Sequence, residues 1–128
     1  MTIATTITPF LTVKDAKSAF EFYAESFGAT ITEQEEMPNG GMIGKVIIDS
    51  AFFWVGDEEP QFGNNSPKSD GESGVRIILT VDDPDTIFSK AIRAGAKQIC
   101  PVTTEEYWRI GKLSDPFGHI WEIGRPLR

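Results

Sequence analysis

The chain has 128 residues, 40% of them hydrophobic, which is enough to form one domain around a substantial core. Its formal net charge of −7 disfavours nucleic acids and anionic membrane surfaces as partners, because phosphate contacts require clustered Lys and Arg. The N-terminal residues lack the basic start and apolar run of a signal peptide. The longest aromatic-aliphatic run, residues 51–55, is too short to cross a membrane. We therefore expect a cytoplasmic protein.

The first predicted strand, residues 7–13, alternates two kinds of side chain. One face carries Ile7, Pro9, Leu11 and Val13, and the other carries Thr8, Phe10 and Thr12. Asp15 then stands where a helix N-cap belongs, and apolar residues at helical spacing continue to Phe27, before Gly28. We expect this helix to cover the apolar face of the strand.

Three more strands are predicted after the helix, at residues 29–35, 42–48 and 51–55. A Pro-Asn-Gly-Gly turn separates the first two. Residues 57–73 are rich in Gly, Asn, Ser, Pro and charge, which indicates a linker loop that is too long for a hairpin.

The same order of elements follows the linker. A strand at residues 75–81 precedes a helix that starts with Asp83 and Pro84 and ends near Gly95. Further strands are predicted at residues 97–101, 107–113 and 119–123. The single cysteine, Cys100, cannot form an internal disulfide, and we expect it to be a buried strand residue.

The two halves are a repeat. Leu11-Thr12-Val13 recurs 68 residues later as Leu79-Thr80-Val81, and Ile43-Gly44-Lys45 recurs as Ile110-Gly111-Lys112. The predicted fold is therefore α+β, with two tandem βαβββ modules (about residues 5–56 and 74–125) that form a cupped mixed sheet within one domain, residues 1–128. A cup lined by threonine, arginine and aromatic residues would be a natural ligand site.

With "PFLTVKDAKSAFEFYAESFGA" in front and "DPFGHIWEI" behind, the chain resembles the glyoxalase/bleomycin-resistance/dioxygenase superfamily, also called the vicinal oxygen chelate proteins. Within it the chain is most similar to the small bacterial branch typified by PhnB-like proteins of phosphonate operons. The resemblance implies homodimers whose cavities are formed by paired modules. It also implies a divalent metal held by four side chains, from the first and last strands of each module.

The four ligand positions that the resemblance implies fall on Thr8, Trp54, Arg76 and Glu122. Only Glu122 is an ordinary metal ligand, and the positive charge of Arg76 would repel a cation and pair with Glu122. One carboxylate does not hold a catalytic metal, which needs about three protein ligands. We therefore expect no metal and no other cofactor. His119 falls on the opposite face of its strand from Glu122, so we expect a structural role for it.

The leading hypothesis is a metal-independent protein that binds a small organic molecule, sequestering or sensing an aromatic or cationic ligand. The predicted ligand-binding residues are Thr8, Phe10, Phe52, Trp54, Arg76, Ile78, Trp108, Arg109 and Glu122. The alternative is a lyase, an isomerase or another enzyme of the superfamily that uses Glu122 as a general base or metal ligand. The sequence leaves open whether the Arg76–Glu122 pair only closes the interior, and whether the chain is an interaction module without a ligand.

Overall fold

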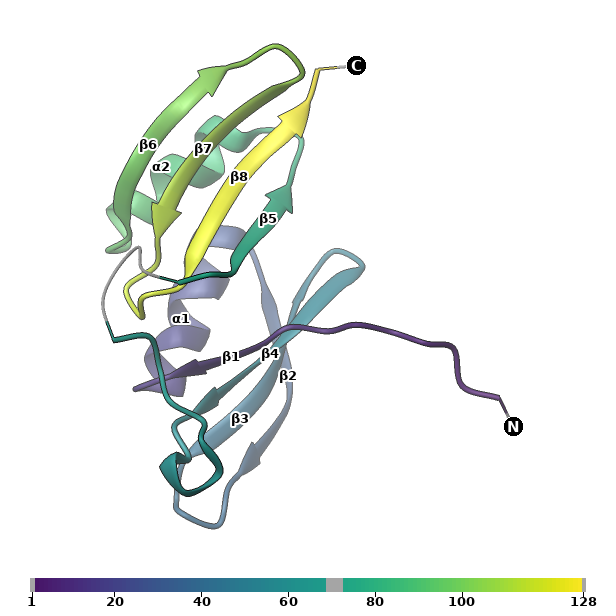
Figure 1. Ribbon diagram of the computed structural model, residues 1–128, viewed down its shortest axis with the longest axis vertical. Helices are drawn as coiled ribbons and strands as arrows, with labels where there is room; N and C mark the ends of the chain where they lie inside the picture. Colours follow the sequence, from purple (N-terminus) through teal and green to yellow (C-terminus); the bar gives the residue numbers. More distant parts are fainter. Residues whose placement is uncertain (1, 69–72, 128) are drawn as a thin grey trace.

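The computed structural model describes residues 2–68 and 73–127 and contains two βαβββ modules (Figure 1). The elements of the first module are β1 (Phe10–Val13), α1 (Ala16–Phe27), β2 (Thr30–Glu36), β3 (Met42–Ile48) and β4 (Ala51–Asp57). Those of the second are β5 (Arg76–Thr80), α2 (Pro84–Arg93), β6 (Lys97–Thr104), β7 (Trp108–Ser114) and β8 (Ile120–Pro126). A short 3-10 helix, η1 (Pro60–Phe62), lies in the linker. Neither described α-helix is long and apolar enough to span a membrane.

Each module forms its own four-stranded mixed sheet, in the order β1-β4-β3-β2 and β5-β8-β7-β6. The first strand of each module runs parallel to the last, and the other neighbours are antiparallel. Figure 1 shows the modules one above the other, with α2 behind the second sheet, and α1 and α2 pack against each other. The prediction of an α+β fold with two tandem βαβββ modules is confirmed.

Side-chain caps fix where both helices begin. The carboxylate of Asp15 accepts a hydrogen bond from the Ser18 N–H at 3.3 Å, and Asp83 accepts one from Thr86 at 3.2 Å. Hydrogen bonds from the Ser18 hydroxyl and backbone lower the pKa of Asp15 below its usual value. Gly28 ends α1 at φ 71°, a conformation that favours glycine.

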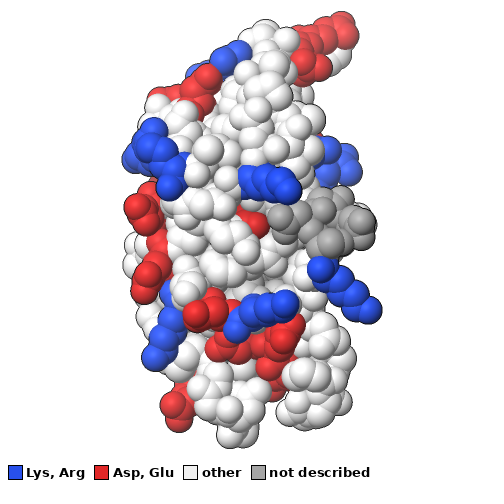
Figure 2. All heavy atoms as spheres, turned by 90° about the vertical axis from the view of Figure 1, so that its left-hand side faces the viewer, with Lys and Arg blue, Asp and Glu red and all other residues white. Residues whose placement is uncertain are grey.

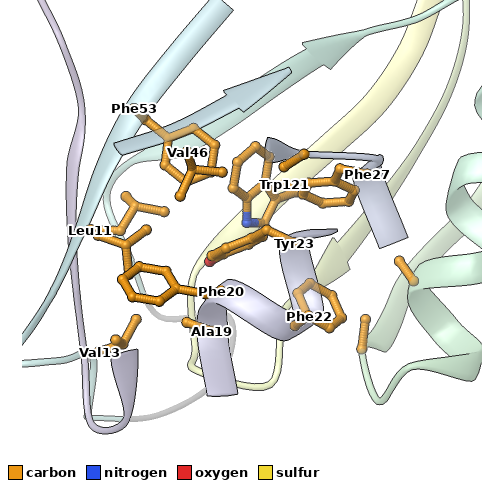
Figure 3. Close-up of a cluster of buried hydrophobic side chains, with 14 of the residues drawn as sticks. Leu11, Val13, Ala19, Phe20, Phe22, Tyr23, Phe27, Val46, Phe53 and Trp121 are labelled. Atoms are coloured by element: carbon orange, nitrogen blue, oxygen red, sulfur yellow. The ribbon is translucent and has the colours of Figure 1, made fainter. Parts of the chain in front are cut away.

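The two modules share one hydrophobic core. Trp121 of β8 lies among aromatic rings of the first module, with its centroid 5.7 Å from Tyr23, 4.9 Å from Phe27 and 5.3 Å from Phe53 (Figure 3). These contacts are tilted or edge-to-face, which is favourable for aromatic pairs. Because β8 contributes to the core beneath α1, the modules are not independent units.

A buried carboxylate joins the modules beside this core. Asp115, only 2% exposed, accepts hydrogen bonds from the Tyr23 hydroxyl at 2.5 Å and the Trp121 indole N–H at 2.9 Å. Its other oxygen accepts the backbone N–H groups of Phe117 and His119, both at 2.9 Å. Burial, together with the nearby charge of Asp115, raises the pKa of Tyr23 well above its usual value. The "DPFGHIW" segment is therefore a structural junction in which one carboxylate has four donors.

Some predicted features differ from the structure. The first strand begins at Phe10 rather than at residue 7, because residues 2–9 find no strand partner beyond one bond from the Trp54 N–H to the Pro9 carbonyl at 3.0 Å. Ile7 is 98% exposed, so α1 does not cover it. Cys100 is also exposed, because β6 is the edge strand of its sheet. In the linker, Glu58 accepts the Ser66 N–H at 2.9 Å, and residues 69–72 lie outside the described part.

Candidate functional site

The face of the first sheet that points away from α1 carries a row of aromatic side chains. On β1 and β4, Leu11 and Val55 are buried toward the helix, so Phe10 and Trp54 point to the opposite face. These two residues are direct neighbours in the parallel register, and Phe52 lies two residues before Trp54 on the same face. Phe10 is 47% exposed and Phe52 is 39% exposed, so this concave face offers apolar area to a ligand.

Glycine at position 56 allows Phe10 to lie against the sheet. A Cβ atom at Gly56 would approach Phe10 Cζ to 2.9 Å and Ile43 Cγ1 to 3.4 Å, so the aromatic ring lies over the glycine. The ring thus becomes part of the floor of the concave face rather than a free side chain.

Charged groups surround this aromatic floor. Lys45 Nζ lies 4.1 Å from the centre of the Phe52 ring and 5.9 Å from that of Trp54, and it pairs with Glu33 at 3.4 Å. A cavity of about 330 Å³ opens beside these groups and is lined by Phe10, Glu33, Glu35, Ile43 and Trp54. The sequence singled out Phe10 and Trp54 but missed the two glutamates, which belong to a β-bulge that strand alternation does not predict.

The second sheet presents an ion pair at the corresponding place. Arg76 Nε donates to Glu122 Oε1 at 2.5 Å, joining β5 to β8. Ile78 lies opposite Glu122 in the parallel register and is 53% exposed. The Glu122 side chain is only 18% exposed, so Arg76 supplies the countercharge that this half-buried carboxylate needs.

A larger cavity of about 860 Å³ lies where the modules meet. Its lining includes Phe10, Thr12, Arg76, Ile78 and His119. His119 Nε2 is 2.8 Å from the Thr12 carbonyl oxygen and ties the start of β8 to β1, in keeping with the expected structural role. Phe10 also lines the smaller cavity, so the two cavities share this residue.

The structure does not bring the remaining predicted residues into this group. Thr8 precedes β1 in the unpaired N-terminal segment, and Trp108 lies at the outer end of the second sheet, opposite Pro126. Arg109 lies on the helix side of β7, where Nε and Nη2 bind the two carboxylate oxygens of Asp85 at 2.8 and 2.7 Å. These hydrogen bonds lower the pKa of Asp85. The site therefore consists of Phe10, Phe52, Trp54, Arg76, Ile78 and Glu122, with Glu33, Glu35 and Lys45 added.

The residues at the four implied ligand positions do not fit a divalent metal. Glu122 is the one carboxylate among them and is engaged by Arg76, while Trp54 has no donor atom for a metal. Within residues 2–68 and 73–127, no group of three or more His, Cys, Asp or Glu side chains is placed to hold a metal ion. These side chains therefore give no basis for metal-dependent chemistry.

Charges of both signs are mixed over the surface. Figure 2 shows Lys and Arg side chains interspersed with Asp and Glu on the face that it presents. The net charge of −7 is thus not gathered into one acidic field on that face.

Comparisons with known proteins agree with the fold. Residues 3–123 match the family model described as the Glyoxalase/Bleomycin resistance protein/Dioxygenase superfamily. An uncharacterized protein of Mycobacterium bovis is 37% identical over 128 residues, covering 95% of this chain and 84% of its own length. A glyoxalase/bleomycin resistance protein/dioxygenase domain from Frankia superposes with a TM-score of 0.76 at 14% identity, covering 98% of this chain and 99% of that one. The fosfomycin resistance protein FosX of Listeria monocytogenes, solved with Mn(II) and sulfate, superposes at 0.70 with 13% identity, covering 97% and 93% of the two chains.

Proposed function

Because the chain belongs to the glyoxalase/bleomycin resistance protein/dioxygenase superfamily, we propose that it is a metal-independent small-molecule-binding protein, of the PhnB-like branch. The observation that carries this proposal is the Arg76–Glu122 ion pair, which stands at two of the four metal-ligand positions that the family resemblance implies. The fold itself accommodates a metal in other proteins, since FosX was solved with Mn(II). In this chain the guanidinium group of Arg76 takes the place that a metal cation would need.

The proposed ligand is an aromatic or cationic molecule that the protein sequesters or senses in the cytoplasm. Phe10, Phe52 and Trp54 supply ring faces for stacking, and because Phe10 and Phe52 are exposed, a ligand would bury apolar area now in water. The Arg76–Glu122 pair offers hydrogen-bonding groups at the other side of the Phe10 ring. This combination of apolar walls and a few polar anchors is typical of small-molecule sites.

We include homodimer formation in the proposal. Each sheet of the chain has an open concave face, and exposed apolar side chains remain at Ile3, Ile7, Val75 and Ile78. A symmetric partner that placed its second sheet over the first sheet of this chain would close the cup and bury these residues. Sedimentation equilibrium should give twice the mass of 14.1 kDa, and a monomer at all accessible concentrations would refute this part.

The alternative is an enzyme, a lyase or isomerase with Glu122 as general base. A general base must reach a substrate proton, and with Oε1 of Glu122 accepting from Arg76 at 2.5 Å only Oε2 could do so, beside a guanidinium group that stabilises the negative charge. The geometry therefore favours binding over proton abstraction.

The test combines metal analysis with ligand screening. Protein purified without an affinity tag should contain no stoichiometric divalent metal. Aromatic cations should raise its melting temperature, because a ligand that binds only the folded state stabilises it. Trp54→Ala should abolish this shift, while Phe62→Ala, which removes a 72% exposed ring of η1 outside both cavities, should preserve it. Stoichiometric metal, or the absence of any ligand-dependent shift, would overturn the proposal.

A further inference from the structure

We propose that the cavity of about 330 Å³ on the first sheet binds a single organic ammonium group, which makes the ligand of this protein a monocation. This inference rests on the proposed function, in which the concave face takes an aromatic or cationic small molecule. It adds the position of the charged group and commits the ligand to a single positive charge.

Two aromatic residues, together with Ile43, form the apolar part of this cavity. Phe10 and Trp54 are neighbours in the register of β1 and β4, and Gly56 lets the Phe10 ring lie on the sheet. Ring faces attract cations through their quadrupole, and indole does so most strongly. An alkylated ammonium group suits this environment better than a metal ion does, because its methyl or methylene groups also bury apolar area.

The chain already places an ammonium group on the neighbouring surface. Lys45 Nζ lies 4.1 Å from the centre of the Phe52 ring and 3.4 Å from the carboxylate of Glu33. One ring face and one carboxylate thus hold an internal cation. The adjoining cavity repeats the arrangement with Trp54, Phe10 and the second carboxylate, Glu35.

The local charges leave room for one further positive charge. Lys45 neutralises Glu33, whereas Glu35 has neither an ion pair nor a hydrogen bond to its side chain among the described residues. Glu33, Glu35 and Lys45 together carry a net charge of −1, so a monocation balances the cavity and an anion would be repelled.

A β-bulge brings both carboxylates to this face. Thr32 pairs with Lys45 and Glu35 pairs with Ile43, so β2 has one more residue than β3 between these pairs. Glu33 lies inside the bulge at φ 51°, a conformation that is uncommon for residues other than glycine. In a regular strand the register of Glu35 would shift by one residue and its side chain would point to the other face.

The rest of the ligand has a defined direction in which to extend. Phe10 lines both the small cavity and the junction cavity of about 860 Å³, whose lining also contains Arg76 and Ile78. An ammonium group beside Trp54 therefore leaves the remainder of the molecule to pass over Phe10 toward the second module.

Choline and its neutral carbon analogue 3,3-dimethyl-1-butanol test this inference, because the two molecules differ in charge but hardly in shape. The chain has three tryptophans, so two-dimensional NMR of the full-length protein gives three indole N–H signals. Titration with choline should move the signal of Trp54, identified with Trp54→Phe, and leave that of the buried Trp121 in place. The neutral analogue should bind at least about threefold more weakly, since cation–π attraction is lost.

Two substitutions should shift the affinity for choline in opposite directions. Glu35→Gln should weaken binding about threefold, and Lys45→Met should strengthen it by a similar factor, because it removes a like charge and frees Glu33. Both changes should leave the affinity for 3,3-dimethyl-1-butanol nearly unchanged. Glu106→Gln and Lys17→Met are matched controls with the same changes of charge on exposed residues outside the cavity, and they should have no effect.

The possible results separate this inference from the proposed function. Binding of choline that responds to Glu35 and Lys45 as described would support the ammonium site. Equal binding of both probes at Trp54, or no response to Glu35→Gln, would overturn it while leaving a small-molecule site in place. If choline moves no Trp54 signal, the ammonium site is refuted, and the aromatic ligands of the thermal screen then decide the proposed function separately.

Discussion

Replacing Asp115 with asparagine should destabilise the junction between the two modules. The aspartate carboxylate has four hydrogen-bond donors around it, two from side chains and two from the backbone. Asparagine keeps the shape but replaces one acceptor oxygen with a donor. If its remaining oxygen keeps the backbone bonds to Phe117 and His119, its amide N–H₂ faces the Tyr23 hydroxyl and the Trp121 indole.

The magnitude follows from which donors can adapt. The Tyr23 hydroxyl can rotate and accept from the amide, but the indole N–H of Trp121 can only donate and loses its partner. A buried donor without a partner costs about 1–3 kcal/mol, and the remaining bonds lose the extra strength of a charged acceptor. We expect a loss of about 3 kcal/mol in the free energy of unfolding, which corresponds to about 10 °C in melting temperature for a chain of this length.

Urea unfolding followed by tryptophan fluorescence measures this loss, because Trp121 is 1% exposed in the folded state. Protein concentration must be held constant so that association does not change the midpoint. Asp85→Asn is the control, since Asp85 pairs with Arg109 on the surface and such exposed pairs contribute little.

The reasoning fails if Asp115→Asn unfolds at the same urea concentration as the wild type with the same slope. That result would mean that the four bonds do not favour the folded state over the hydrated unfolded chain. A loss of comparable size in Asp85→Asn would also refute it, because the effect would then reflect net charge rather than the buried junction.

Three further outcomes are expected. The free energy of unfolding should fall as the pH rises above about 10, by at most about 1.4 kcal/mol per pH unit. The reason is that Tyr23 in the folded protein keeps the proton that the unfolded chain loses. Urea unfolding at a series of pH values measures this decline, which should be missing in Tyr23→Phe. Gly44→Ala should cost about 1–3 kcal/mol in the same assay, because its Cβ would lie 2.7 Å from Phe20 Cζ, and unchanged stability would contradict the packing described. Gly56→Ala should weaken choline binding in the NMR titration by displacing the Phe10 ring, and an unchanged affinity would show that this ring is not part of the site.

The repeat made the order of elements predictable. Matching triplets at a constant spacing, together with cap residues such as Asp15 and Asp83, indicated where each helix begins, and the structure has helices at these places. Local signals succeed here because an N-cap needs only a side chain that accepts from a backbone N–H three residues later. Strand alternation likewise separated Glu122 from Trp121, which is buried against the helices.

Several members of the candidate site lay beyond these local signals. Alternation cannot reveal the bulge in β2 that brings Glu33 and Glu35 to one cavity, because an extra residue in a strand appears only when its partner strand is known. The sequence predicts Arg109 as a ligand-binding residue, yet its partner Asp85 belongs to the other side of the sheet. That β1 begins only at Phe10 also depends on tertiary context, since the isolated pattern of residues 7–13 is that of a strand.

By itself, the sequence determined the class of fold and the duplicated module, because these depend on residue types at fixed spacings. It also shows that Thr8, Trp54 and Arg76, at three of the four ligand positions that the resemblance implies, are not ordinary metal ligands. Only the tertiary structure decided that Asp115 joins the modules through Tyr23 and Trp121, and that Lys45 and two glutamates surround the aromatic floor. Those contacts join residues far apart in the chain or depend on one irregular strand. They exist only once the sheets have formed and their registers are fixed.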